Sequence, residues 1–583
     1  MKNAKKSLAM LLAAMVAMGS LAGCGSDKPV TDNSSKAETD SSTASKTEET
    51  PVKADDVQEF SFKTGDEPNG LNPILNNTEP DYSVCNIFYE TLIRYGANED
   101  NVATVKPGMA EKWEISEDGK TYTFHLRDAK WSDGVAVKAD DFVYTYRTMA
   151  DPAVASTCAF LLSGLVVNFQ EALLDEEGKK PADIGVSAPD DKTVVIQLTK
   201  STPYFLSLLS KIKPIRQDKY EEFGAAYGSD VSKIVTNGMF NLQSWDPNVQ
   251  MTFVKNPEYW NAENVKLEKI NRKIIKELAT GAQAYLAGDI DTFGTSDPDW
   301  KKAIEDDGNY TVISQVQTNP EYVIMNCSNK YLKNAKIRLA LSLAYDREGL
   351  VESIADGLGE PLYSMMPSPI GLGDKLYTDV VGGANQKILK DLVAKYPDPK
   401  ALLIEGLKEE GLDPDPAKME LSYLSRGTGE WSKKEAEWLL QMWREKLGIE
   451  IKIDLVEWNI MWGRIDSGDY DIATGGWTPD YNDPDALLSI FDPEIGYFDA
   501  KKTGWTDDSS KKFHELIVKE QNETDPAERA KLLLEAETLL VSEAVVIPTY
   551  TGISNTYVRN YVKGYHTSPS CYMDYSNLYI EGK

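Results

Sequence analysis

The sequence predicts an α/β protein that folds into at least two lobes, and three observations lead to this prediction. More than 500 residues follow position 56, which exceeds what one hydrophobic core normally supports. Apolar residues recur with period two in some segments, such as 122–126, and with period 3.6 in others. Helical and strand patterns also alternate along residues 436–474. This alternation is typical of an α/β lobe with a mixed sheet.

The elements of this alternating segment follow from residue spacing. Five apolar residues between 436 and 447 share one helical face, and Gly448 can end that helix in a left-handed cap. Apolar and charged residues then alternate over 449–455, which predicts a half-buried strand. We expect a short helix over 459–465 and a further strand over 470–474.

The first residues of the chain have the pattern of a secretory signal peptide. Three lysines precede an apolar run from Leu8 to Met18, which is too short to span a membrane. Small residues then precede Cys24, as in the bacterial lipobox, so we expect cleavage after residue 23 and lipidation of Cys24. Residues 24–56 are polar and lack aromatic side chains, which predicts a disordered tether. The predicted location is the outer face of the bacterial cytoplasmic membrane.

Charge and cysteine usage exclude several classes of protein. The formal net charge is −30, so nucleic acid is not an expected partner. Apart from Cys24, the cysteines lie far apart and form no C-x-x-C or other metal motif. Two disulfides are compatible with an exported chain, but free buried thiols are the expected state of these four residues, Cys85, Cys158, Cys327 and Cys571.

No catalytic signature is present in the sequence. It contains no G-x-S-x-G, H-E-x-x-H, P-loop or G-x-G-x-x-G motif, and its three histidines have no neighbouring ligand set. The acidic run 480–485 lacks the glycine and the final glutamate of a calcium loop. We therefore expect no enzyme, no cofactor and no metal. One alternative stays open, because the 92 acidic residues could include the carboxylate pair of a secreted glycoside hydrolase.

Four segments, in order along the chain, carry a resemblance to a known family. They are Ala110 to Pro152, Thr236 to Trp260, Lys336 to Val351, and Gly468 to Phe491. Each resembles bacterial extracellular solute-binding proteins of family 5, which bind peptides or nickel for ABC importers, and specifically their oligopeptide-binding branch. The likeness covers essentially all of the chain beyond the tether.

This resemblance implies a two-lobed fold of the periplasmic-binding-protein type, with two hinge strands, an extra inserted subdomain and the ligand enclosed between the lobes. On this basis lobe I comprises 57–79, 214–317 and 548–583. The inserted subdomain comprises 80–213, and lobe II comprises 318–547.

The segment from Thr474 to Tyr481 also indicates a peptide ligand on its own chemistry. Two glycines at the end of a strand allow another backbone to approach closely, as pairing with an extended peptide requires. The carboxylate of Asp480 could hold the ligand's α-ammonium, and the Trp477 ring could add cation–π attraction. The alternative is a turn-forming aspartate beside a core tryptophan. The candidate peptide-binding residues of this segment are Gly475, Gly476, Trp477, Thr478, Asp480 and Tyr481.

Two further candidates come from the resemblance. Glu67 lies in a segment, 65–73, that matches the part of lobe I flanking the ligand, although its proline and glycines could merely shape a turn. Arg464 lies near the position of a family arginine that can meet a peptide's C-terminal carboxylate, with a spacing that differs by one residue. The family's second arginine is replaced here by Thr474, so the preferred peptide length stays open.

The predicted function is therefore that of a monomeric, lipid-anchored oligopeptide receptor that delivers its ligand to the transmembrane subunits of an ABC permease. Alternatives within the same fold are a receptor for a nickel chelate, haem or an oligosaccharide, and a receptor for peptide pheromones.

Overall fold

The computed structural model describes residues 57–98, 102–569 and 573–583. The predicted signal peptide, the whole of the predicted tether including Cys24, and Cys571 lie outside these residues. Within them, no helix is long and apolar enough to cross a membrane. Cys85, Cys158 and Cys327 are buried free thiols, as predicted.

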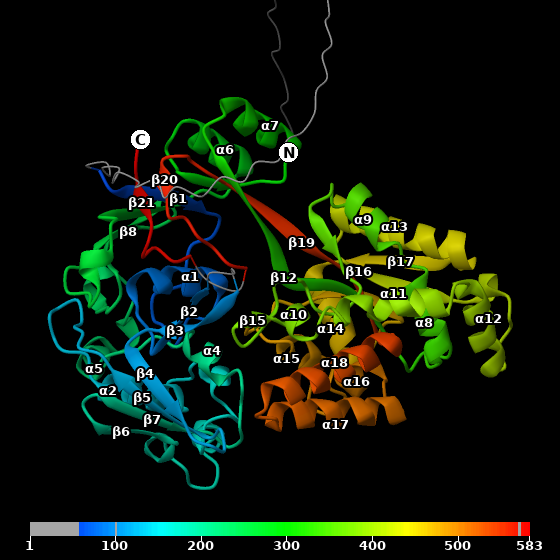
Figure 1. Cartoon of the computed structure of the whole chain (residues 1–583), viewed down its shortest axis with the longest axis horizontal. Coiled ribbons are helices and arrows are strands. Elements are labelled where there is room, and N and C mark those ends of the chain that lie inside the picture. The colour runs from blue at the N-terminus through cyan, green and yellow to red at the C-terminus, as the bar shows by residue number, and fades with distance from the viewer. Residues whose placement is uncertain (1–56, 99–101, 570–572) are drawn as a thin grey trace, which may run out of the picture. The chain divides into compact units, whose positions relative to one another are not determined.

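One eleven-stranded mixed sheet runs through the described chain (Figure 1). Ten strands follow each other across it, and β13 (Gly359–Pro361) pairs with β19 beside this path. The order is β17 (Ile451–Val456), β16 (Leu421–Arg426), β18 (Ile472–Gly476), β12 (Thr311–Met325), β19 (Val546–Val558), β11 (Thr292–Gly294), β1 (Glu59–Thr64), β10 (Lys269–Ile274), β9 (Gln250–Lys255) and β8 (Phe240–Asp246).

The two long strands, β12 and β19, connect the two halves of this sheet. They pair antiparallel from Thr311 opposite Val558 to Ile324 opposite Val546. The ladder is interrupted between Val316 and Pro320, which is a β-bulge or irregularity near the middle of β12. The predicted lobe boundaries, after 317 and after 547, fall inside these two strands. The division into lobes and an inserted subdomain itself stays a prediction.

The first half of the sheet shares one hydrophobic core with the segment predicted as an insert. That segment contains a four-stranded sheet in the order β4 (Ala110–Ile115), β5 (Thr121–Leu126), β7 (Thr193–Gln197) and β6 (Val186–Asp190). The predicted strand 122–126 is confirmed as β5, whose buried residues alternate with partly buried ones. Phe60 of β1 and Phe124 of β5 belong to the same buried cluster, so the two sheets pack as one unit.

The second half of the sheet is the predicted α/β segment. Helix α13 (Glu430–Leu447) joins the parallel strands β16 and β17, and Gly448 ends it at φ 81°, as predicted. Helix α14 (Trp458–Ser467) then leads to β18, which pairs parallel with β16 and antiparallel with β12. The last strand begins two residues later than predicted, so both glycines lie within it. Buried clusters on this half include Trp443 of α13 and Leu424 of β16.

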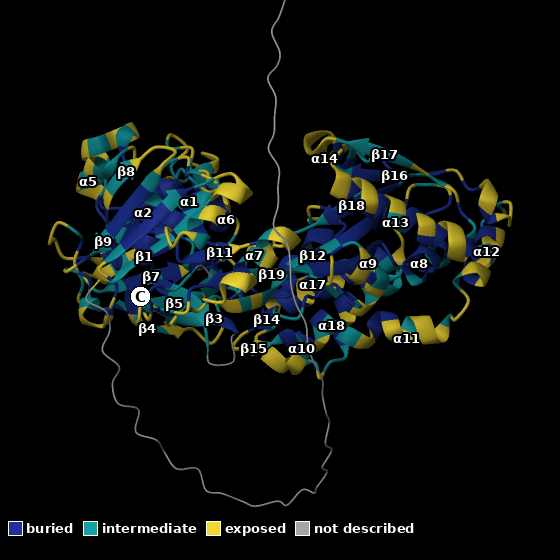
Figure 2. Cartoon of the chain, turned by 90° about the horizontal axis from the view of Figure 1, so that it is seen from above, coloured by how far each residue is buried: buried dark blue, intermediate teal, exposed yellow. Residues whose placement is uncertain are grey.

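Figure 2 shows β16 and β18 as largely buried and the edge strand β17 as mostly intermediate, with exposed residues concentrated on helices such as α12 (Pro399–Glu409). The carboxyl ends of β16, β17 and β18 meet at one edge of the sheet, because the three strands run parallel. Ligands of open α/β sheets collect at this edge. We therefore expect a ligand site at the segment that follows β18.

Candidate functional site

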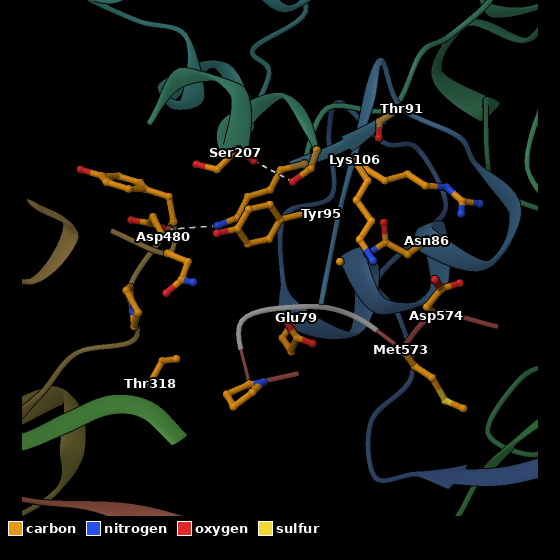
Figure 3. A pocket seen from close by; sticks show the side chains of 18 of the residues that line it. Glu79, Asn86, Thr91, Tyr95, Lys106, Ser207, Thr318, Asp480, Met573 and Asp574 are labelled. Atoms are coloured by element: carbon orange, nitrogen blue, oxygen red, sulfur yellow. Dashed lines mark hydrogen bonds and ion pairs between the residues drawn. The ribbon is translucent and has the colours of Figure 1, made fainter. Parts of the chain in front are cut away.

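A cavity of about 620 Å³ lies where this edge meets segments from the first half of the chain (Figure 3). Its lining comes from α1 (Glu79–Phe88), β2 (Ile93–Ala97), β3 (Ala103–Pro107), the turn after α4 (Phe205–Leu209), the middle of β12 and the loop after β18. This volume is in the range of small-molecule sites. The loop after β18, residues 477–482, is called the site loop below.

The two glycines before the site loop lie close against side chains of the neighbouring strand. A Cβ atom on Gly475 would lie 2.5 Å from Cε2 of Tyr322, and one on Gly476 would lie 2.8 Å from Oε2 of Glu321. Both neighbours belong to β12, which pairs with β18 at these positions. The close approach that the glycines allow here is therefore to β12, and approach of a ligand backbone stays a prediction.

The ladder between β18 and β16 ends short of the site loop. The ladder pairs between β16 and β18 in the described chain are those of Ile472 and Ala473. Thr474, Gly475 and Gly476 thus pair with β12 on one side. Their opposite edge makes no ladder pair with β16, but Thr474 and Gly475 are buried, so the addition of an extended chain at this edge stays a prediction.

Tyr481 fixes the far end of the site loop. Its ring stacks on Tyr204 with centroids 4.0 Å apart and planes 8° apart. Its hydroxyl donates to Oδ2 of Asp485 at 2.5 Å. Gln521 donates to Oδ1 of the same aspartate and accepts from Lys200 at 2.9 Å. The loop is consequently held by contacts with residues 200–204 as well as by its own half of the sheet.

A buried charged group supports the loop from behind. Arg529 donates to both carboxylate oxygens of Asp483, at 2.7 and 2.8 Å, and to Oε2 of Glu520 at 2.9 Å. All three side chains are at most 7 % exposed. Burial raises the pKa of Glu520 well above its usual range, and the neighbouring Asp485 raises it further. Glu520 therefore holds a proton more readily than an ordinary glutamate does.

Asp480 lies at the cavity with its carboxylate accessible. Its side chain is 51 % exposed, and Oδ1 lies 3.6 Å from Nζ of Lys211 in the turn after α4 (Figure 3). This distance makes a loose ion pair rather than a hydrogen bond. A carboxylate in this state can accept a further cationic donor on its second oxygen.

Three of the predicted residues, Thr478, Asp480 and Tyr481, line the cavity together. Trp477 does not line it, because its ring packs against Tyr497 and Phe498 with centroids 5.3 and 6.3 Å away. The lining also excludes the other predicted residues, Gly475, Gly476, Glu67 and Arg464.

Glu67 and Arg464 have partners of their own in the structure. Oε1 of Glu67 accepts from the indole of Trp245 at 2.7 Å and from the backbone N–H of Asn248 at 3.1 Å. Arg464 of α14 lies 3.3 Å from Oδ2 of Asp454 and donates to the carbonyl of Asp469. Contact of either side chain with a ligand stays a prediction.

Four further charged residues of the cavity could not be recognised from local sequence patterns. Glu79, Arg94, Lys106 and Asp574 come from segments that only the fold brings together. Burial opposes ionisation of Asp574, yet Arg94 and Lys106 lower the pKa of this carboxyl below its usual range. These residues make the wall opposite the site loop strongly polar. No group of three or more potential metal ligands occurs among the described residues.

Comparison with known proteins defines the class of this fold and site. Residues 104–498 match the family described as "Bacterial extracellular solute-binding proteins, family 5 Middle". The chain belongs to this family, and the predicted resemblance is confirmed.

Individual relatives match this chain along most of their own length. The chain is 32 % identical to the oligopeptide-binding protein OppA of Bacillus subtilis over 496 residues, which is 83 % of this chain and 86 % of the relative. Among solved structures, the unliganded open form of the periplasmic murein tripeptide-binding protein MppA has a TM-score of 0.76 at 25 % identity. This match covers 91 % of this chain and 98 % of MppA.

A complex of Haemophilus influenzae OppA with the peptide RPPGFSPFR has a TM-score of 0.67 at 27 % identity, covering 91 % and 100 % of the two chains. These similarities confirm the predicted fold class, a two-lobed α/β solute-binding protein. The names of these relatives describe binding proteins rather than enzymes.

Proposed function

We propose that this chain is the oligopeptide receptor of an ABC importer, and that it captures peptides in the cavity beside the site loop. The observation that carries this proposal is the accessible carboxylate of Asp480, which follows a strand edge that makes no ladder pair with β16 beyond Ala473. A peptide's α-ammonium could pair with this carboxylate, and its extended backbone could pair with this strand edge. The names of the relatives support the same ligand class.

Main-chain pairing accounts for the part of capture that does not depend on the peptide's sequence. The edge of β18 that makes no ladder pair with β16, at residues 474–476, could pair with one face of an extended peptide. Gln317, Thr318 and Asn319 line the cavity where the ladder of β12 is interrupted, so they offer further polar groups to the ligand. Backbone pairing leaves the peptide's side chains in the remaining volume, where water can fill the gaps.

Closure of the two lobes is the second part of the proposal. The higher TM-score to an unliganded open form than to a peptide complex suggests that this structure represents the open arrangement. Closure would bring further predicted residues to the ligand, namely Trp477, Gly475, Gly476 and Glu67, with Arg464 as a receptor for the C-terminal carboxylate. Hinge closure of this kind is common in two-lobed binding proteins.

The remaining parts concern location and partners. We propose that a signal peptide, residues 1–23, is removed and that lipidated Cys24 anchors a monomer to the outer face of the bacterial cytoplasmic membrane. The polar segment up to residue 56 would then act as a tether that lets the receptor reach the permease. Growth with labelled fatty acid tests the anchor, because Cys24→Ser should abolish the label.

Ligand identity tests the proposal most directly. We expect mass spectrometry of the purified protein, after denaturation, to release peptides, and calorimetry with defined peptides to give saturable binding at one site. Co-purification of a sugar, haem or nickel chelate instead, together with no measurable peptide binding, would overturn the peptide assignment.

A further inference from the structure

The ion pair between Lys211 and Asp480 places a second ammonium group beside the proposed receptor of the ligand's N-terminus. Both side chains line the cavity, and their charged atoms are 3.6 Å apart. Lys211 follows α4, whereas Asp480 follows β18, so the pair joins two segments that are distant in sequence.

The surrounding contacts hold this pair in place. Tyr204 immediately precedes α4, and Tyr481 immediately follows Asp480; their rings are stacked at 4.0 Å. The side chain of Lys211 is only 23 % exposed, which restricts its movement into solvent. Lys211 is therefore expected to stay near Asp480 when a ligand arrives.

The other charges nearby do not neutralise an additional ammonium. Lys213, which is buried, donates to the carbonyl of Lys211 at 3.2 Å, and burial lowers the pKa of its amine to about 8. This lysine is still mostly charged at neutral pH. Glu79 of α1 lines the cavity and attracts Lys213 electrostatically, so these two charges offset each other. The lining as a whole has four carboxylates, Glu79, Glu90, Asp480 and Asp574, and three cations, Arg94, Lys106 and Lys211, so that with buried Lys213 the formal charges balance in the absence of ligand.

We propose that Lys211 makes the receptor select peptides by the charge of their first side chain, favouring aspartate or glutamate and disfavouring lysine or arginine. This inference rests on the proposed function, in which Asp480 receives the α-ammonium. With both ammonium groups on one carboxylate, the local charge becomes positive. An acidic first side chain restores neutrality, whereas a basic one adds a third positive charge.

The geometry supports this selection because few bonds separate the α-ammonium from the first side chain. Both leave the same carbon atom, so an ammonium seated on Asp480 places the first side chain within reach of Lys211. The pair with Asp480 is longer than a hydrogen bond, so Lys211 can turn toward a ligand carboxylate at little cost.

The test measures dissociation constants for pentapeptides made of alanine with glutamate, glutamine or lysine as the first residue. For the unchanged protein we expect the glutamate peptide to bind about tenfold more tightly than the lysine peptide, with the glutamine peptide between them. Lys211→Met and Lys211→Gln should reduce this ratio to about one. Lys211→Arg should preserve the preference, because it keeps the charge.

Lys138→Met is the matched control for net charge. Lys138 belongs to the same segment of the chain, pairs with Asp191 at 2.9 Å and lies outside the cavity lining, so this variant should keep the full preference. An unchanged ratio in both neutral Lys211 variants would overturn the inference. So would an equal loss of the ratio in Lys138→Met, because the effect would then be long-range.

The outcomes also separate this inference from the proposed function. If none of the peptides binds the unchanged protein, the proposed function and the inference both fail. If they bind, lose affinity on Asp480→Ala, and yet show no dependence on Lys211, only the inference fails.

Discussion

Two loops of this protein were predicted to contact the ligand, and their candidate carboxylates have different surroundings in the structure. The site loop follows β18, and the segment 65–73 follows β1, a strand of the same sheet. Each contains a candidate carboxylate. Asp480 lies in the cavity, half exposed, with only a loose ion pair to Lys211. Glu67 accepts two hydrogen bonds, from Trp245 and Asn248, and does not line the cavity.

The two carboxylates differ in the hydrogen bonds that they already accept within the protein. Hydrogen bonds of 2.7 and 3.1 Å fix Glu67 to its own half of the protein, so a ligand would have to compete with them. Asp480 has no such bond to lose, while the residues after it are firmly held by Tyr204, Asp485 and Arg529. A rigid loop that carries one accessible carboxylate is suited to binding a charged group.

The largest expected effect concerns the support behind the site loop. Arg529→Met removes the partner of two buried carboxylates, Asp483 and Glu520, so the free energy of unfolding should fall by about 3 to 5 kcal/mol. Urea denaturation measures this loss. Arg444→Met is the control, because Arg444 and Glu450 form a pair at 2.7 Å with both side chains about 60 % exposed, and little change is expected there. Equal losses in the two variants would show that the buried group does not support the loop.

The next effect concerns binding by Asp480. Asp480→Ala should weaken peptide affinity by roughly 2 to 5 kcal/mol, because it leaves the ligand's ammonium without a partner in the closed cleft. Acetylation of the peptide's amino terminus should cost the unchanged protein a similar amount. Calorimetry on all four combinations should show strong coupling, with acetylation mattering much less to the variant.

Asp508→Ala is the control for this experiment, since Asp508 is 99 % exposed on α17 (Asp508–Asn522). If the losses from Asp480→Ala and from acetylation simply add, Asp480 does not meet the amino terminus.

A smaller effect is the pH dependence that Glu520 gives to the loop support. A carboxyl group whose pKa is raised in the folded state stabilises the fold below its unfolded value of about 4.5. This contribution is lost as the pH rises toward the folded pKa. Glu520→Gln should therefore flatten the decline in unfolding free energy above pH 4.5, measured as the difference between variant and unchanged protein.

The variant has to be compared with the unchanged protein because burial also raises the pKa of Glu537 to about 7. Glu537 therefore makes the free energy of unfolding decline with rising pH in the same way as Glu520 does. Glu450→Gln serves as a control of opposite sign, since Arg444 lowers the pKa of that carboxyl. If Glu520→Gln has the same pH profile as the unchanged protein, the pKa of Glu520 is not raised in the fold.

The smallest expected effect is that of Glu67→Ala. Loss of the acceptor for Trp245 should lower the free energy of unfolding by about 1 kcal/mol. A direct contact with ligand would add a loss of affinity, which we expect to be less than about tenfold because the carboxylate is already engaged. Calorimetry with the peptide used for Asp480→Ala separates the two contributions. A loss as large as that of Asp480→Ala would remove the contrast between the two loops.

The sequence was sufficient for the elements whose signals are local. Helix α13 with its Gly448 cap, and the alternation of Tyr122, Phe124 and Leu126 in β5, depend on spacing within one segment. Strand β18 ends two residues later than predicted, because glycines lack a strand signal of their own. Their place in the sheet depends on the side chains of Tyr322 and Glu321, which belong to another strand.

The candidate site was predictable only in part for the same reason. Asp480 could be recognised from its neighbours in the sequence, and the structure places it at the cavity. Lys211, Glu79 and Asp574 come from three separate segments, and nothing in their local sequence marks them as neighbours of Asp480. Likewise, no local pattern shows that Trp245 engages Glu67 across 178 residues of chain.

The part of β12 at which the ladder is interrupted is also part of the cavity wall. Gln317, Thr318 and Asn319 lie where the ladder to β19 is broken, between the two halves of the sheet, and they also line the cavity. Thr551 of β19 keeps this segment attached by donating to the carbonyls of Gln317 and Asn319. A ligand that binds in the cavity as proposed would contact β12 at the point where its ladder is interrupted. If the lobes also close as proposed, one short segment would take part both in ligand contact and in the movement between the two halves of the sheet.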